Sequence, residues 1–91
     1  MKVHKRKSGT AWLEVEGREI RRVDYSMVVY NNGGVLEGDG TLKADTAYLL
    51  AAYDAKSAVL RTGGGAAVQI VIEQLVGVTE AEFRTVGPVA E

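Results

Sequence analysis

Apolar and polar residues alternate along most of the chain, the pattern of strands that bury one face. The clearest case spans residues 23–43, where two alternating segments flank an Asn-Asn-Gly-Gly sequence at 31–34. Asn-Gly between such segments is typical of a type I′ hairpin turn, because both central residues of that turn need a positive φ. We therefore predict a hairpin with Asn32 and Gly33 at the centre of its turn.

This turn fixes a pairing in which Tyr25 lies opposite Gly40 and Met27 lies opposite Gly38. Apolar and polar side chains then separate onto two faces of the hairpin. The inward set is Val23, Tyr25, Met27, Val29, Leu36 and Leu42, and the outward set is Asp24, Ser26, Glu37, Asp39 and Thr41. Two glycines on the apolar face predict a sheet that bends sharply, with an aromatic ring covering the gap.

The preceding strand predicts a tight turn at residues 16–17, which would pair Leu13 with Ile20 and bury Ile20. The next strand, however, keeps odd-numbered residues inside. Both statements hold only if the chain contains one extra residue, so we predict a β-bulge near Arg21 and Arg22.

The second half of the chain predicts a helix and three further strands. Asp45 is a good N-cap for a helix over 45–55, with Leu49, Leu50, Ala52 and Tyr53 available to cover the sheet. A glycine loop at 63–65 then joins two strands. A final strand over 80–86 stops at Gly87-Pro88, and we place it at a sheet edge because proline cannot donate to a ladder.

In the second hairpin, the glycine loop sets Leu60 opposite Val68 and Ala58 opposite Ile70. The predicted fold class is α+β and mostly β, in the order β-β-β-α-β-β-β. Two antiparallel three-stranded meanders joined by one short helix form a curled sheet, a small barrel or a sandwich. We divide the single domain, 1–91, into a basic N-terminal segment (1–8), a first meander (9–43), the helix (45–55) and a second meander (57–86).

Composition narrows the function classes. The 91 residues are 46% hydrophobic and 25% charged, as in ordinary globular domains. They include no cysteine, which excludes disulfides, thiolate metal sites and a cysteine nucleophile. The basic start lacks the apolar run of a secretory signal, and no segment has the roughly 18 apolar residues of a membrane span. We expect a cytoplasmic protein without a membrane partner.

Charge is unevenly distributed along the chain. Residues 1–22 carry seven Lys/Arg and three Glu, a net charge of +4, whereas residues 23–91 carry four Lys/Arg and nine acids, a net charge of −5. Such asymmetry permits a polyanion-binding end. The favoured alternative is a frayed, solvated basic terminus.

Catalytic chemistry has little support in the sequence. His4 is the one histidine and lies among lysines, where it is a poor general base. Glu37 and Asp39 share one strand face, but their sequence lacks a calcium-loop pattern and fits a solvated surface. The glycines at 63–65 precede a strand and not the helix that a phosphate loop needs. We therefore predict no catalytic residue, metal or cofactor.

The remaining candidates lie on outward faces. They form one predicted interaction surface: Trp12, Arg21, Arg22, Val28, Tyr30 and Val35. Trp and Arg are typical of protein-binding hot spots, and exposed apolar groups mark interfaces. The leading hypothesis is a non-catalytic protein-interaction module, accessory protein or inhibitor, with self-association into a homodimer as one form.

Two alternatives remain open. The first is a nucleic-acid-binding β domain that uses the basic N-terminal segment and Trp12. The second is a small-ligand-binding barrel, which requires an interior polar cavity, whereas the predicted inward residues indicate a filled core.

Overall fold

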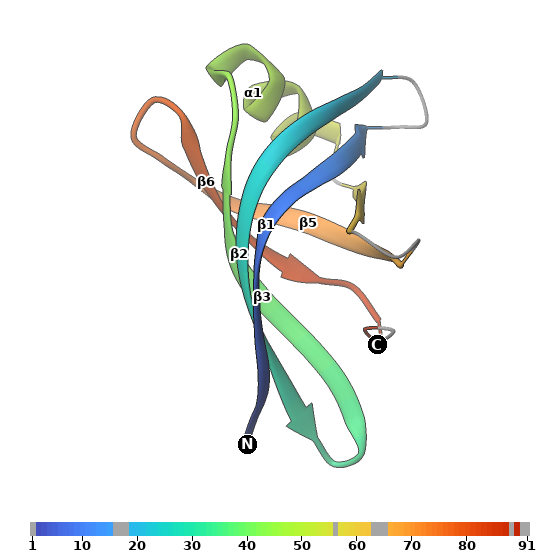
Figure 1. The fold of residues 1–91 in the computed structure, drawn as a ribbon. Coiled ribbons are helices and arrows are strands. Elements are labelled where there is room, and N and C mark those ends of the chain that lie inside the picture. The colour runs from blue at the N-terminus through green and yellow to red at the C-terminus, as the bar shows by residue number, and fades with distance from the viewer. Residues whose placement is uncertain (1, 16–18, 56, 63–65, 88, 90–91) are drawn as a thin grey trace.

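The computed structural model describes residues 2–15, 19–55, 57–62, 66–87 and 89. Six antiparallel strands and one helix follow each other in the predicted order (Figure 1). Their bounds are β1 Lys2–Val15, β2 Glu19–Asn32, β3 Val35–Lys43, α1 Thr46–Ala55, β4 Ala58–Arg61, β5 Ala67–Val76 and β6 Glu80–Thr85.

The strands close into a barrel in the order β1-β2-β3-β6-β5-β4. Each half is a meander, as predicted, and the pairs β1–β4 and β3–β6 join the halves. The structure thus selects the barrel among the three predicted arrangements. Closure also shows that the edge position predicted for β6 is wrong, because β6 lies between β3 and β5. Its ladder ends at Thr85, three residues before the proline, so no ladder donor is lost.

The first hairpin has the predicted faces but not the predicted register. Asn32 pairs with Val35, so Gly33 and Gly34 are the central turn residues, with φ of 63° and 90°. Two glycines adopt these angles without the penalty that a side chain brings, which favours them over Asn-Gly here. Met27 therefore lies opposite Gly40 and not Gly38. Each partner moves by two residues, and since side chains alternate with a period of two, inside and outside are unchanged.

The β1–β2 connection differs from the prediction in length. The turn predicted at 16–17 lies outside the described residues, but the ladder ends at Val15 opposite Glu19, leaving three residues between them. Leu13 consequently pairs with Arg21. Odd-numbered residues of β1 pair with odd-numbered residues of β2, so no extra residue is needed to keep the odd-numbered residues of β2 inside. The bulge predicted at Arg21 and Arg22 is wrong, as is the burial of Ile20, which is 54% exposed.

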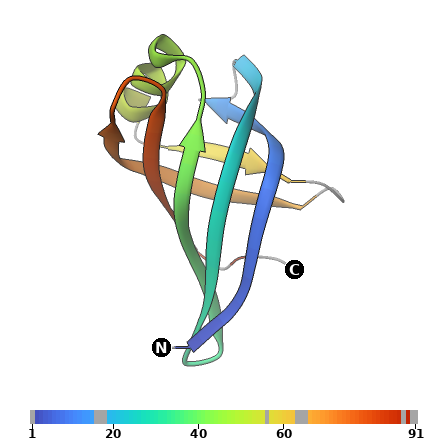
Figure 2. The same cartoon turned by 60° about the vertical axis from the view of Figure 1, so that its left-hand side comes forward.

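The basic N-terminal segment belongs to the sheet. β1 starts at Lys2, and residues 2–8 pair with β2 down to Asn31, with one irregularity between Val3 and Lys5. Lys7 faces inward opposite Met27 and is half-buried, as a long aliphatic stem allows. The first meander therefore begins earlier than the predicted residue 9. Together with the β2–β3 tip it forms an extension below the barrel (Figure 2).

The helix α1 closes the opposite end of the barrel (Figure 1). Asp45 precedes it, and the Asp45 carbonyl accepts the first helical hydrogen bond from Leu49 N–H at 3.1 Å. Its buried residues are Tyr48, Leu49 and Ala52, so the predicted cover of Leu50 and Tyr53 is wrong, since each is 45% exposed. The Tyr48 hydroxyl donates to the Leu13 carbonyl, tying the helix to β1. Among the described residues, no helix has the length and apolar character needed to cross a membrane.

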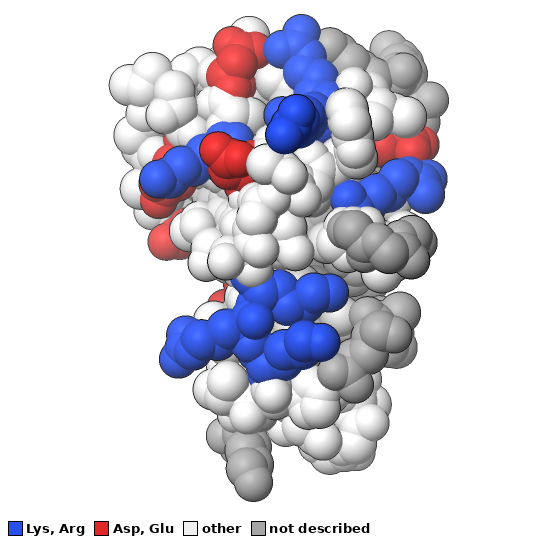
Figure 3. Space-filling view, in the orientation of Figure 1, with Lys and Arg blue, Asp and Glu red and all other residues white. Residues whose placement is uncertain are grey.

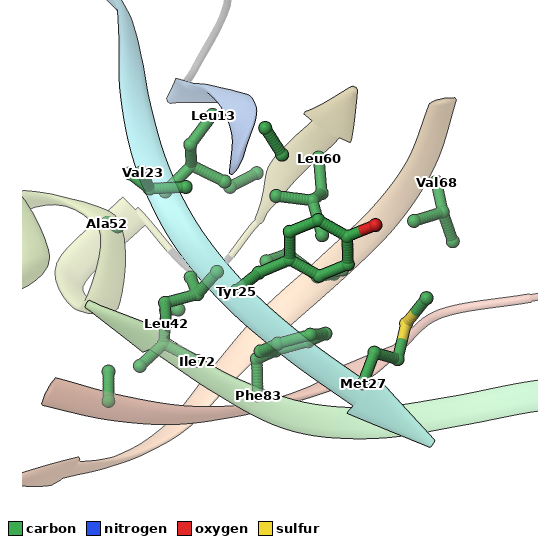
Figure 4. Packing of buried hydrophobic residues seen from close by; sticks show 14 of the residues in the cluster. Leu13, Val23, Tyr25, Met27, Leu42, Ala52, Leu60, Val68, Ile72 and Phe83 are labelled. Atoms are coloured by element: carbon green, nitrogen blue, oxygen red, sulfur yellow. The ribbon is translucent and has the colours of Figure 1, made fainter. Parts of the chain in front are cut away.

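The barrel interior is filled by apolar side chains that converge from all sides (Figure 4). Leu13, Leu42, Leu60 and Ile70 have no exposed surface, and Phe83 is 1% exposed. Leu60 pairs with Val68 and Ala58 with Ile70, as predicted. The inward residues of each strand meet here because the alternation in every strand is in phase with the barrel wall.

Candidate functional site

Trp12 points out of the barrel, as predicted, and is 51% exposed. It lies on β1 between two arginines, because Arg22 of β2 and Arg61 of β4 are its cross-strand partners. Arg61 also donates to the Glu14 carboxylate at 3.0 Å. A large exposed aromatic ring thus stands on a regular sheet, with guanidinium-bearing residues on both flanking strands.

Ile20 belongs to the same surface, although its predicted place was in the core. It pairs with Glu14 on β2's outward face, two residues from Arg22, so it is a diagonal neighbour of Trp12 within side-chain reach. We call Trp12, Ile20, Arg22 and Arg61 the Trp12 patch. The alternation along β2 alone predicts an outward Ile20, because Ile20 lies two residues from the outward Arg22 and therefore on the same face.

Arg21 does not join this surface, which corrects its predicted place. It pairs with Leu13 on the inward side of β2, at the helix end of the barrel. Its guanidinium carbon lies 5.0 Å from the centre of the Tyr48 ring, and Nη1 is 2.9 Å from Asp45 Oδ2. Arg21 therefore holds the start of α1 against β2. The ion pair is half exposed and contributes at most ~1 kcal/mol.

Val28, Tyr30 and Val35 are on the outward face, as predicted, but they lie at the other end of the sheet. Val28 is six residues from Arg22 along β2, about 20 Å at ~3.3 Å per residue. Val28 is half-buried, and Val35 at the hairpin tip is 42% exposed. The six candidate residues therefore do not form one surface.

Tyr30 has an acidic neighbour on β3. Its hydroxyl donates to Asp39 Oδ1 at 3.3 Å. The Asp39 carboxylate raises the pKa of the Tyr30 phenol above its ordinary value of 10.0, because a nearby negative charge opposes a phenolate. Tyr30 is therefore neutral and a hydrogen-bond donor at physiological pH.

A polar groove of about 410 Å³ adjoins this pair, on the seam where β3 leaves β6. Its charged lining combines Glu37 and Asp39 from β3 with Arg84 from β6, whose Nε donates to Glu73 at 3.1 Å. The sequence predicts the two carboxylates as solvated surface and carries no signal for Arg84, which only barrel closure brings here. The groove lies outside the filled barrel interior.

Basic side chains gather on the face formed by β1 and β2. Lys5, Arg6 and Lys7 are consecutive on β1, with Arg6 outward opposite Val28. Figure 3 shows Lys and Arg in two zones, one across the narrow middle of this face and one toward the helix end, with uncharged surface between them. Asp and Glu are also visible on this face, mostly beside the upper zone (Figure 3), and Asp39 lies on the outward face of β3 opposite Val28, in the same cross-strand row as Arg6.

Within the described ranges, no three His, Cys, Asp or Glu residues are placed to hold a metal ion. His4 is exposed at the irregularity of β1. Comparisons with protein families, curated proteins and solved structures found no match to this chain.

Proposed function

We propose that this chain is a non-catalytic binding module that docks a protein partner through the Trp12 patch. The observation that carries the proposal is Trp12, half exposed on the barrel wall between Arg22 and Arg61. Trp and Arg are the residue types that dominate binding energy at protein interfaces, and Ile20 adds exposed apolar surface beside them.

The sheet supports this role by holding the patch in place. Trp12 and Arg22 lie within continuous ladders, and their strands enclose the core, so little backbone freedom is lost when a partner binds. The Glu14–Arg61 ion pair further orients one guanidinium. Such a surface suits an accessory protein or an inhibitor, which needs a rigid contact face and no reactive group.

The test uses Trp12→Ala with Tyr53→Ala as matched control, because Tyr53 is an aromatic residue of similar exposure on α1. A partner purified from the native host should bind Trp12→Ala ~30-fold more weakly, which corresponds to ~2 kcal/mol for a hot spot. Tyr53→Ala should bind as the wild type does. Calorimetry with the purified partner measures both, and equal affinity of all three proteins would refute the proposal.

Self-association is the form of this function that needs no second protein. Sedimentation velocity over a concentration series should then show a dimer that Trp12→Ala converts to a monomer, while Tyr53→Ala stays dimeric. A wild-type monomer at all concentrations contradicts the dimer and leaves a different partner protein as the required ligand.

A nucleic-acid binder is the second candidate, and the basic cluster at Lys5, Arg6 and Lys7 favours it. In this case Trp12 stacks a base while the cluster contacts phosphates. The sequence pI of about 5.8 weighs against it. Affinity for a single-stranded oligonucleotide should fall steeply with salt, and Arg6→Gln should reduce the slope by about 0.7. Absence of binding at low salt refutes this candidate.

A further inference from the structure

Part of β1 pairs with β2 alone among the described strands. β1 and β2 are each 14 residues long and pair along their length, but β4 has only 4 residues and meets β1 at Trp12–Val15. Among the described strands, none pairs with Arg6–Ala11 on the side away from β2. In Figure 2 this part of β1 runs along the margin of the sheet.

A strand margin of this kind offers backbone N–H and C=O groups at every second residue. Arg6–Ala11 would place about three residues in position to bond an added chain. An incoming strand would lie in line with β4 and continue the wall beyond Arg61, where β4 ends. Its backbone would complete a ladder that the short β4 leaves incomplete.

The positive charge of this strand margin indicates which kind of strand it can bind. Arg6 faces outward and Lys7 inward, with Lys5 next to them, so both faces of an added strand would meet cations. A second copy of this chain that pairs antiparallel along residues 2–10 would set Arg6 opposite Arg6 of the other copy, and like charges directly opposite each other are destabilising. Lysines on an edge are a common protection against self-pairing. They favour an acidic strand for the same electrostatic reason.

We propose that the Arg6–Ala11 edge of β1 accepts an extended acidic segment of a partner protein as an added strand. This inference rests on the proposed function and names a second contact and its chemistry. Main-chain hydrogen bonds hold the segment, and Asp and Glu side chains on its outward face meet Arg6. The segment passes close to Trp12, so one partner can engage the edge and the Trp12 patch together.

The probe is a fluorescein-labelled ten-residue peptide in which Glu and Asp alternate with Val and Thr. Two N-methylated versions, each methylated at alternate residues, block one backbone edge of the peptide each. Fluorescence anisotropy with the wild-type protein should show that one version binds at least tenfold more weakly than the parent peptide while the other is unaffected. Equal affinity of both versions would overturn strand addition, and this comparison does not depend on any variant folding.

Protein variants test the charge requirement. Arg6→Glu should lower the affinity for the parent peptide at least tenfold. Lys43→Glu, at an exposed position on β3, should leave this affinity unchanged. Amide exchange should slow in residues 6–11 when the peptide is bound. An equal effect of both variants, or slowing confined to other strands, would overturn the proposal. Tighter binding of a single-stranded oligonucleotide of equal charge would also overturn it, in favour of nucleic acid.

The outcomes separate this inference from the proposed function. If Trp12→Ala loses the native partner while both N-methylated peptides bind equally, the edge fails and the Trp12 patch stands. If the peptide binds by one backbone edge and Trp12→Ala still binds the native partner, strand addition at Arg6–Ala11 is supported and docking through the Trp12 patch is refuted.

Discussion

Gly40 is the position where the barrel tolerates a side chain least. A Cβ built there would lie 2.8 Å from the Cα of Met27 and closer still to the carbonyl oxygen of Ser26. Carbon atoms in contact prefer about 3.5–4.0 Å, so the backbones of β2 and β3 would have to separate. Gly40 is not among the glycines with positive φ, so the conflict is steric and not conformational.

The strand has nowhere to move, because Gly40 pairs with Met27 on one side and Phe83 on the other. We therefore expect Gly40→Ala to destabilise the protein by about 3 kcal/mol, the upper part of the range for overpacked sites. For a domain of this size, that lowers the melting temperature by roughly 12–24 °C.

Gly38→Ala is the matched control on the same strand. Its Cβ would lie 3.1 Å from the Sδ of Met27, a flexible side chain that can move, and 3.1 Å from the Val28 carbonyl oxygen. The β3–β6 ladder starts only at Asp39, so on the β6 side Gly38 is held by a single hydrogen bond, from its N–H to Thr85 Oγ1 at 2.9 Å. Since alanine also lowers the entropy of the unfolded chain, worth ~0.4–1 kcal/mol, we expect a net loss of about 1 kcal/mol or less.

Thermal and urea unfolding followed by far-UV circular dichroism measure both variants. We expect the free energies of unfolding of the two variants to differ by at least ~2 kcal/mol. If Gly40→Ala unfolds at the same urea concentration as Gly38→Ala, the close approach of β2 and β3 does not exist as described, and the bend of the sheet must have another cause.

Three further predictions concern other parts of the molecule. Tyr48→Phe should lose ~1–2 kcal/mol in urea unfolding because it leaves the Leu13 carbonyl without its hydroxyl donor, and no change would contradict that contact. Phe83→Ala, at the largest fully buried side chain, should cost ~3–5 kcal/mol, and a loss below 1 kcal/mol would contradict its burial. In ultraviolet titration, Tyr30 should ionise above pH 10.0 and Asp39→Asn should lower that pKa. Any stability from the raised pKa is present below pH 10.0 and is lost as the pH rises further, so a Tyr30 that ionises below pH 10.0 refutes the sign.

The candidate site was predictable only in part. Alternation alone placed Trp12 outward, and the structure confirms it. The predicted faces of Ile20 and Arg21 were wrong. The connection between β1 and β2 has three residues and not two, and this one-residue difference turns each residue at the start of β2 to the opposite face of the sheet. Local sequence does not fix that length, since glutamate and glycine at 16–17 are compatible with either turn.

The sequence by itself determined the order of elements, the inward residues of the first hairpin and the pairing of Leu60 with Val68. These follow from a period of two along each strand and from glycines that permit reversal, both local properties. Only the tertiary structure decided that the meanders close into a barrel and that β4 stops short of β1's lower half. Those features depend on pairing between residues far apart in the chain, and burial alone does not specify which strand ends meet. The margin at Arg6–Ala11, which no described strand pairs on the side away from β2, follows from the shortness of β4.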